Sequence, residues 1–432
     1  MPARRRVVIT GAGVVSPLGT GKGRFFSGLR EARSGIRRIQ SFDASAFSAR
    51  LAGEVPDVDP AAIPLPFPEA AALRRDPKAL FGLLAAREAI GQALPKGPIA
   101  TWFDPFGVGL SMATGLEIFH APDLAPHLRG DRLDAAGLLR DALAAPVHAF
   151  LEIPSDLAVR CVAREAGLRG PIAVNVSACA AGTQAMGEAF WLVRDGELDA
   201  VVTGGFDSMV NPLGVGGFTL LGALSESNDL HRGASRPFDA DRDGFVLGEG
   251  AAAFFFETLD SARARQAPIL AEVLGYGSTM DAFRVSDPDE HQQGAVAAMR
   301  AALSDAGLSP GDVDYINAHG TGTRKNDPAE SRAIREVFGA TPPPVSSTKS
   351  QIGHLIGAAG AVEAMAVLFA IEQQILPATL NLRTPDPACD LDYVPNQPRA
   401  ARVRVALSNS FGFGGQNACL VLAACDRDVI RR

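Results

Sequence analysis

Cys179 is the cysteine of this sequence whose surroundings favour a chemical role. It lies in the run VNVSACAAGT (174–183), where an apolar, strand-like stretch ends and an Ala-rich stretch of helical length begins. This join places the sulfur at a helix N-terminus, where the helix dipole and free backbone N–H groups favour thiolate over thiol. Because its neighbours are small, Cys179 is a candidate nucleophile. An inert buried cysteine is the alternative.

Two histidines occupy Gly-flanked turns beside predicted elements. His319 follows an expected strand in NAHGTGT (317–323), and His354 precedes an expected helix in SSTKSQIGHLIGAAG (346–360). Residues at the carboxyl ends of strands are where α/β sheets place their chemistry. A zinc site of Cys179, His319 and His354 is a weaker alternative, because the sequence has no paired-cysteine clip. The remaining histidines have no such setting: His120, His127, His148, His231 and His291.

Two glycine-rich runs invite a nucleotide-binding interpretation that their neighbours do not support. After Gly11-Ala12-Gly13, the third glycine of a dinucleotide fingerprint is replaced by Ser16, and Pro17 interrupts the helix that the fingerprint needs. We expect a tight strand-to-loop turn there. The run 214–217 lacks the Lys and Ser/Thr of a phosphate loop, and we expect it to serve packing.

The expected strands and helices must hold these candidate side chains in place. Runs rich in Val, Ile and Phe alternate with Ala-rich runs of helical length, which predicts an α/β fold. Several expected strands are apolar throughout, as is typical of strands covered on both faces. The expected strands are 6–10, 107–111, 172–176, 200–203, 251–257, 269–275, 313–317, 403–407 and 418–422, and the expected helices are 180–194, 293–306, 328–338 and 357–373.

Length and composition indicate a globular chain of two core-forming units. The 432 residues are 47% apolar and 21% charged. The charged, small-residue run LDSARARQAP (259–268) is the expected join, so we predict halves at 1–258 and 259–432. A net charge of −7 argues against a nucleic-acid or membrane-surface partner.

Cysteine usage and hydropathy favour the cytoplasm. The five cysteines fit neither a disulfide framework nor a metal clip, and the first residues lack a signal-peptide core. The run 355–371 is the nearest to a membrane span, but it contains Glu363 and is rich in Gly and Ala. We expect it to be a buried helix.

Longer motifs give a resemblance that runs nearly end to end. The sequence resembles the elongating beta-ketoacyl-[acyl carrier protein] synthases, the KAS II-type condensing enzymes of the thiolase superfamily, including type II polyketide ketosynthases. The matching motifs are VVITGAGVVSPLG (7–19), SACAAG (177–182), NPLGVGGF (211–218), SRPFDADRDGFVLGEGA (235–251), NAHGTGTRKND (317–327), SSTKSQIGHLIGAAGAVE (346–363), CDLDYVP (389–395) and NSFGFGGQNA (409–418).

The resemblance implies a thiolase-type αβαβα sandwich of two similar halves that condenses malonyl and acyl groups with loss of CO2. It implies an acyl carrier protein as partner, and either a homodimer or a heterodimer with a chain-length-factor-type paralogue. No metal or cofactor is implied, because the substrates are held on the phosphopantetheine of the carrier.

The resemblance also assigns roles by position. It makes Cys179 the acyl-accepting nucleophile and His319 and His354 the pair that assists decarboxylation. Lys349 matches the lysine beside this pair, and Glu363 matches its salt-bridge partner.

Further positions match substrate contacts. Thr321 and Thr323 match residues that contact the phosphopantetheine arm. Phe413 matches a gating residue whose backbone N–H joins that of Cys179 in an oxyanion hole, and Phe411 is assigned to substrate binding.

Two departures concern chain length and docking. The stretch 121–146, which shapes the acyl tunnel and dimer contact in relatives, does not match, so the chain length is not predicted. Gly222 stands where relatives tend to carry an Arg that faces the carrier. The segment with Arg74, Arg75 and Lys78 resembles a basic docking patch, and an ordinary solvated loop is its alternative.

Other classes of protein remain as alternatives. A non-catalytic chain-length-factor-type subunit would lack the nucleophile, so Cys179 argues against it. A thiolase would need a second catalytic cysteine, and Cys419 lies in an apolar, strand-like run. Fatty-acid and polyketide or polyene ketosynthases share these catalytic residues, and we favour the fatty-acid role slightly.

Overall fold

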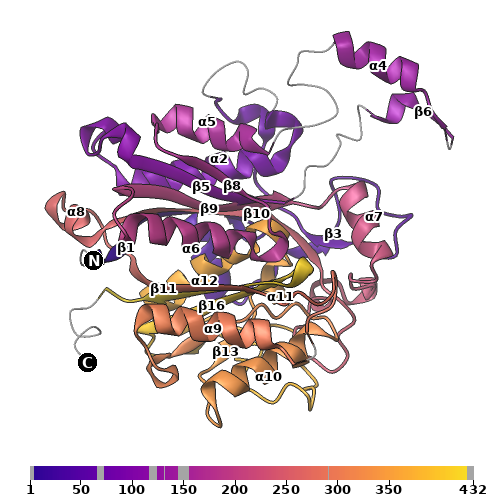
Figure 1. Ribbon diagram of the computed structural model, residues 1–432. Helices are drawn as coiled ribbons and strands as arrows, with labels where there is room; N and C mark the ends of the chain where they lie inside the picture. Colours follow the sequence, from indigo (N-terminus) through magenta and orange to yellow (C-terminus); the bar gives the residue numbers. More distant parts are fainter. Residues whose placement is uncertain are drawn as a thin grey trace.

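Five layers of helices and strands build the molecule (Figure 1). The computed structural model describes residues 4–65, 73–115, 124–130, 132–144, 155–289 and 291–425. Two groups of strands alternate with three layers of helices. The outer layers contain α2 (Pro77–Ala93) and α5 (Asp156–Ala166) on one side, and α9 (Gln293–Ala306) and α10 (Asn326–Phe338) on the other. Between the strands lie α6 (Ala181–Arg194) and α12 (Ala359–Gln373).

The strands fall into two groups with the same internal order. The first group is β1 (Val7–Ser16), β5 (Val108–Thr114), β8 (Ile172–Asn175), β9 (Ala200–Ser208) and β10 (Leu247–Thr258). The second is β11 (Ala271–Met280), β12 (Tyr315–Asn317), β13 (Val345–Ser346), β16 (Val405–Gly412) and β17 (Gln416–Ala423). Their spatial orders are β8-β5-β9-β10-β1 and β13-β12-β16-β17-β11, so each runs third, second, fourth, fifth, first along its own chain segment.

Antiparallel pairing of β1 with β11, in which Val7 lies opposite Val273, joins the two groups into one sheet path. The predicted boundary between 258 and 259 coincides with the end of β10 and the start of α8 (Leu259–Ala264), and it stays a prediction. The remaining helices and strands are β2 (Gly19–Thr20), α1 (Lys22–Arg30), β3 (Ile36–Arg38), β4 (Leu51–Gly53), β6 (Leu128–Arg129), β7 (Arg132–Leu133), α4 (Ala135–Ala144), α7 (Pro212–Leu220), α11 (Lys349–Ile352), β14 (Ile375–Leu376) and β15 (Arg399–Ala400).

Residues 359–371 of the central helix α12 are all buried, because the helix lies between sheets rather than on the surface. In the described part of the chain, one helical segment is long and apolar enough to cross a membrane, Ile356–Gln373, and 89% of it is buried inside the structure. The expectation of a buried helix at 355–371 is therefore confirmed.

Close helix crossings explain several glycines. A Cβ on Gly182 of α6 would lie 2.8 Å from the backbone nitrogen of Ala361, and one on Gly360 of α12 would lie 2.8 Å from that of Thr183. Because the two helices start against each other's backbone, neither position has room for a side chain.

The predicted turn at Gly11-Ala12-Gly13 is wrong. These residues lie within β1, paired with Phe255 to Ala253 of β10. A Cβ on Gly11 would lie 1.9 Å from the carbonyl oxygen of Ala89, so the glycines allow α2 to pack directly on the strand.

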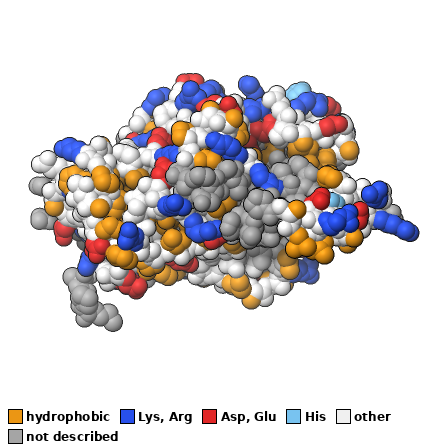
Figure 2. All heavy atoms as spheres, turned by 90° about the horizontal axis from the view of Figure 1, so that it is seen from above, with side chains coloured by type: hydrophobic (Ala, Val, Ile, Leu, Met, Phe, Trp, Pro, Cys, Tyr) orange, Lys and Arg blue, Asp and Glu red, His pale blue; other side chains and the backbone are white. Residues whose placement is uncertain are grey.

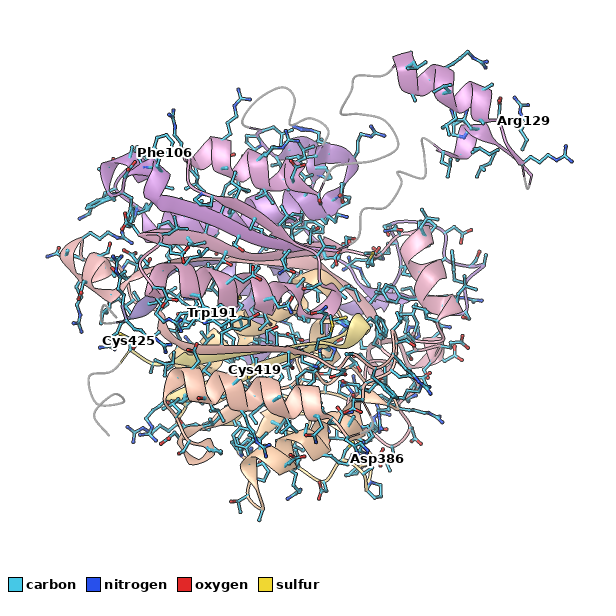
Figure 3. All side chains as sticks on the ribbon, in the orientation of Figure 1. Phe106, Arg129, Trp191, Asp386, Cys419 and Cys425 are labelled. Carbon is cyan, nitrogen blue, oxygen red and sulfur yellow. The ribbon has the colours of Figure 1, made fainter. Side chains whose placement is uncertain are left out.

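An arm of β6, β7 and α4 stands apart from the layers in Figure 1, and Figure 3 shows Arg129 near its far end. Apolar side chains are exposed along it, including Leu139 (59%) and Leu143 (79%). Of the stretch 121–146, residues 121–123, 131, 145 and 146 lie outside the described residues, as do His120 and His148.

Candidate active site

Cys179 lies in a tight turn between β8 and α6. It occupies the 3₁₀ turn Ala178–Ala180, and its side chain is buried. Ala178, directly before it, has φ of 53°, a left-handed conformation that costs energy for a residue with a side chain. Such strain is typical of functional turns, and here it fixes the direction of the cysteine at the helix start.

The thiol is held in the protonated form in the free site. Burial raises the pKa of Cys179 to about 11, while the backbone N–H of Phe413, which donates a hydrogen bond to the sulfur, and the charge of Lys349 act in the opposite direction. Burial of the sulfur thus opposes the effect expected of the helix start, and the preference for thiolate stays a prediction.

The structure brings Cys179, His319 and His354 together from three separate elements. The cysteine sulfur and one ring nitrogen of each histidine lie within 4.8 Å of one another. His319 follows β12, and His354 lies between α11 and the 3₁₀ turn Ile356–Ala358. The two imidazole rings are 5.2 Å apart between centroids and nearly perpendicular, at 82°. Both are buried.

Hydrogen bonds determine which nitrogen of each imidazole carries the proton. The backbone N–H of Ile356 donates to Nδ1 of His354 at 3.2 Å, and Nζ of Lys349 lies 3.4 Å from Nδ1 of His319. Both Nδ1 atoms face donors, so both Nε2 atoms carry hydrogens. Burial and then the nearby charge of Lys349 lower the pKa of both histidines well below the usual value. The site therefore presents two neutral imidazole N–H donors.

Lys349 and Glu363 form a buried ion pair behind the histidines. Their side chains are each 1% exposed, and Nζ of Lys349 also donates to the carbonyl oxygen of His319 at 2.6 Å. Burial raises the pKa of Glu363 to about 7, and the charge of Lys349 opposes this rise. Lys349 thus fixes both the backbone and the ring of His319.

The same hydrogen bonds argue against the zinc alternative. A histidine that binds a metal usually donates its second ring N–H to a carboxylate or carbonyl. Here the partners of both Nδ1 atoms are themselves donors, which leaves hydrogens on the Nε2 atoms. The donor pattern therefore fits the recognition of a negatively charged oxygen better than that of a cation.

A channel of about 310 Å³ leads to these three side chains. The predicted substrate residues Thr321, Thr323, Phe411 and Phe413 all line it. The two threonine hydroxyls are hydrogen-bonded to each other at 2.9 Å, and the ring of Phe411 lies 6.1 Å from that of His319. Cys419 of β17 is fully buried and is not among the residues that line the channel, which removes the support for a thiolase-type second cysteine.

Gly412 lies against the cysteine turn. A Cβ there would lie 3.1 Å from the backbone nitrogen of Cys179 and 3.2 Å from that of Ala180. Glycine thus lets the Phe413 turn approach the backbone N–H groups beside the sulfur, where the negatively charged oxygen of a tetrahedral intermediate would lie.

Sequence reasoning missed three residues that support the site. The carboxylate of Glu330 accepts the backbone N–H groups of His319 and Gly320, each at 2.8 Å. Asp207 accepts the N–H of Gly357 at 2.8 Å, and the ring of Phe245 lies 5.1 Å from that of His354. The acid that follows His319 by eleven residues in NAHGTGTRKNDPAE was the available signal for Glu330.

The predicted docking patch stays a prediction, and the structure does not favour it at Lys78. Lys78 is 5% exposed and pairs with Asp76 at 3.5 Å in the first turn of α2, so it is not a surface cation. Arg74 is half-buried and donates to the carbonyl oxygen of Ile63 at 3.0 Å. None of Arg74, Arg75 and Lys78 is among the lining residues of the Cys179 channel. On the face seen in Figure 2, basic side chains are spread between acidic and hydrophobic ones.

Two family models cover most of the chain. Residues 4–262 match "Beta-ketoacyl synthase, N-terminal domain" and residues 270–383 match "Beta-ketoacyl synthase, C-terminal domain". The fold and the cysteine and histidine site thus define a condensing enzyme, and the chain belongs to the beta-ketoacyl synthase family.

Its relatives extend over nearly the full length. A 3-oxoacyl-[acyl-carrier-protein] synthase 2 of Synechocystis sp. is 42% identical over 96% of this chain and 97% of its own, and one of Coxiella burnetii is 40% identical over 97% and 99%. The predicted family is therefore confirmed.

Solved structures give the same result. A beta-ketoacyl synthase from Burkholderia phymatum has a TM-score of 0.85 at 32% identity, and the ishigamide ketosynthase/chain length factor has 0.84 at 37%, each over 98% of this chain and 100% of that one. A type II polyketide acyl-carrier protein in complex with its ketosynthase has 0.81 at 32% identity, with the same coverage. The predicted thiolase-type fold is confirmed.

Proposed function

We propose that this protein condenses an acyl chain on Cys179 with a malonyl group on an acyl carrier protein, releasing CO2. The observation that carries the proposal is the grouping of the Cys179 sulfur with two neutral histidines that donate from Nε2, within 4.8 Å of one another at the end of one channel. The roles of Lys349, Glu363 and the channel residues follow from this arrangement.

The first step is acyl transfer. The sulfur of Cys179 attacks the carbonyl carbon of the incoming thioester, and the carbon–sulfur bond to the phosphopantetheine breaks. The proton of the cysteine thiol ends on the departing phosphopantetheine sulfur, so the exchange needs no net base. The backbone N–H groups of Cys179 and Phe413 would stabilise the oxyanion of the tetrahedral intermediate.

The second step is decarboxylative condensation. The malonyl carbon–carboxylate bond breaks, CO2 leaves, and the electron pair enters an enolate whose oxygen receives the Nε2–H groups of His319 and His354. The enolate carbon attacks the acyl-enzyme carbonyl, and collapse of the tetrahedral intermediate expels the Cys179 thiolate, which takes up one proton from solvent. Both imidazoles can donate these hydrogen bonds while uncharged, because their Nδ1 atoms accept from Ile356 and Lys349.

Peptide mapping of the acyl-enzyme tests the proposal. After incubation with an acyl thioester, we expect acylation of Cys179 in the wild-type protein and in Cys161→Ala, and none in Cys179→Ala. Figure 3 marks Cys419 on β17 and Cys425 near the end of the chain as further internal controls. Acylation of Cys161 or Cys419 with Cys179 unmodified would refute the proposal.

A dimer is part of the proposal. Within the described residues, β8 is an end strand that pairs with β5 alone. Its first residue, Ile172, is 45% exposed, and Val176, which directly follows the strand, is 49% exposed. An apolar open edge invites a strand from a second copy. We expect sedimentation of a dimer and its loss in Ile172→Lys/Val176→Lys. A heterodimer with a paralogue would instead give a monomer when this chain is expressed alone.

The finer assignments rest on the same relatives. We propose a cytoplasmic enzyme that works on carrier-bound substrates and needs no cofactor of its own. A panel of saturated, polyene and polyketide acyl carriers distinguishes the fatty-acid role from the polyketide role by the chain that elongates fastest.

A further inference from the structure

A second hollow opens beside the Cys179 channel. It has a volume of about 320 Å³. The two hollows adjoin, because they share the lining residues Asp287, Pro288, Gln292, Arg324 and Lys325. The second hollow therefore lies directly beside the channel that leads to the sulfur.

Among the described residues, cations outnumber acids around this hollow. It is lined by Arg284, Arg324, Lys325 and Arg332 against Asp287 and Asp289. Asp287 is already engaged, because it accepts from Lys325 at 2.6 Å and lies 3.5 Å from Arg284.

Asp289 is also engaged. Its carboxylate accepts the backbone N–H of Gln293 at 3.2 Å, at the start of α9. The described lining of the second hollow therefore carries two more cations than acids, in a chain whose net charge is −7.

Arg324 and Arg332 each have guanidinium N–H groups without a hydrogen-bond partner among the described residues. Arg332 is exposed and makes no ion pair or hydrogen bond within the described part of the chain. Arg324 donates from Nε to the carbonyl oxygen of Arg242 at 3.3 Å, and its other guanidinium nitrogens make no such bond to a described residue. Arginine side chains in this state suit acidic groups and phosphodiesters, which accept two parallel hydrogen bonds.

The channel mouth also exposes apolar side chains. Leu221 is 59% and Val285 is 81% exposed, and both line the Cys179 channel. Leu220, at the end of α7, is 91% exposed. A partner that covers the mouth would therefore meet apolar contacts and positive charge together.

We propose that Arg284, Arg324, Lys325 and Arg332, here called the rim cations, form the docking surface for an acidic carrier protein. The inference rests on the proposed function, since a carrier whose arm reaches Cys179 must settle on the mouth of this channel. An acidic partner approaching a chain of net negative charge needs a local positive field to be steered there. The rim cations supply this positive field beside the channel. The segment with Arg74, Arg75 and Lys78 does not line the channel.

Charge reversal at Arg332 tests the docking surface, because Arg332 lines the second hollow but not the Cys179 channel. We expect Arg332→Glu to lower kcat/KM for an acyl-carrier substrate about tenfold at low salt and less than about twofold near 0.5 M salt. Acylation by a small N-acetylcysteamine thioester should change by less than about twofold, because this donor has no carrier to dock. The double variant Arg332→Glu/Arg284→Glu should show a larger loss of kcat/KM for the carrier-bound substrate and no larger change with the small thioester.

Two matched variants complete the test. Lys96→Glu makes the same change of charge at an exposed position just after the C-terminal end of α2. This variant should have the carrier kinetics of the wild type. Arg74→Glu/Arg75→Glu should affect carrier kinetics less than Arg332→Glu. An unchanged carrier kcat/KM in Arg332→Glu, an equal loss with the small thioester, or an equal loss in Lys96→Glu would overturn the inference. Failure of both donors to acylate wild-type Cys179 would instead overturn the proposed function, and the inference with it.

Discussion

Lys349 holds His319 at two points, through the carbonyl oxygen at 2.6 Å and beside the ring Nδ1 at 3.4 Å. The lysine does not point into the channel itself, and it is not among the lining residues. Its charge, balanced by Glu363, keeps the hydrogen of His319 on the nitrogen that faces the substrate.

Replacing Lys349 by Met should separate this role from stability. Lys349→Met leaves Glu363 buried without its partner, so we expect a loss of about 3 kcal/mol in unfolding free energy. Decarboxylation should fall about 100-fold, because the ring of His319 loses the donor that fixes its tautomer. Lys349→Met/Glu363→Leu removes the unpaired charge and should regain most of the melting temperature but not the activity. Recovery of both would show that Lys349 is merely structural.

Replacing either histidine should damage the two half-reactions unequally. His319→Ala and His354→Ala each remove one donor to the enolate oxygen, and we expect malonyl decarboxylation to fall by about 100-fold or more. Acyl transfer to Cys179 should fall by less than about tenfold, since its oxyanion contacts backbone N–H groups instead. Isotope-labelled CO2 release and acyl-enzyme mass spectrometry measure the two steps. An equal loss in both would contradict this division of labour.

The reactivity of Cys179 should rise steeply with pH. Its pKa is raised to about 11 by burial, so the reactive thiolate is scarce at neutral pH. Alkylation by iodoacetamide should accelerate about tenfold per pH unit between pH 7 and 9, without levelling off, whereas a free peptide thiol levels off above about pH 8.5. Peptide mapping identifies the alkylated residue. A plateau near neutral pH would indicate that the helix start outweighs burial after all.

Removal of metal ions should leave the reaction unchanged. Both Nδ1 atoms face donors, which keeps hydrogens on the Nε2 atoms that a metal would need. We expect the same kcat before and after dialysis against a chelator. Loss of activity that Zn²⁺ alone restores would revive the zinc site.

Local sequence patterns were sufficient to predict features that depend only on the helix or strand in which the residues lie. The expected helix 293–306 is α9, which ends where Gly307 turns left-handed at φ of 67°. The structure does not favour the prediction that Lys78 is a surface cation. The basic run around it does not reveal that α2 packs its first turn inward. Glu330 was missed because it reaches His319 only after α10 folds back on the preceding loop.

Gly11 shows a related limit. Its lack of a side chain suggested a turn, but what it allows is the approach of a helix distant in sequence, the one that contains Ala89. A glycine in a sequence indicates that a side chain would not fit at that position. It does not identify the segment whose close approach excludes the side chain.

The turn before α6 has a counterpart before α12, so one backbone geometry occurs at both helix starts beside the active site. Ala178-Cys179-Ala180-Ala181-Gly182 and Ile356-Gly357-Ala358-Ala359-Gly360 each follow the third strand of their group, open a 3₁₀ turn on a residue of positive φ, and end on a glycine at the helix crossing. The first turn carries the nucleophile within it, and the second has His354 two residues ahead of it. The two turns therefore share a backbone geometry and differ in the reactive side chain that each one holds in place.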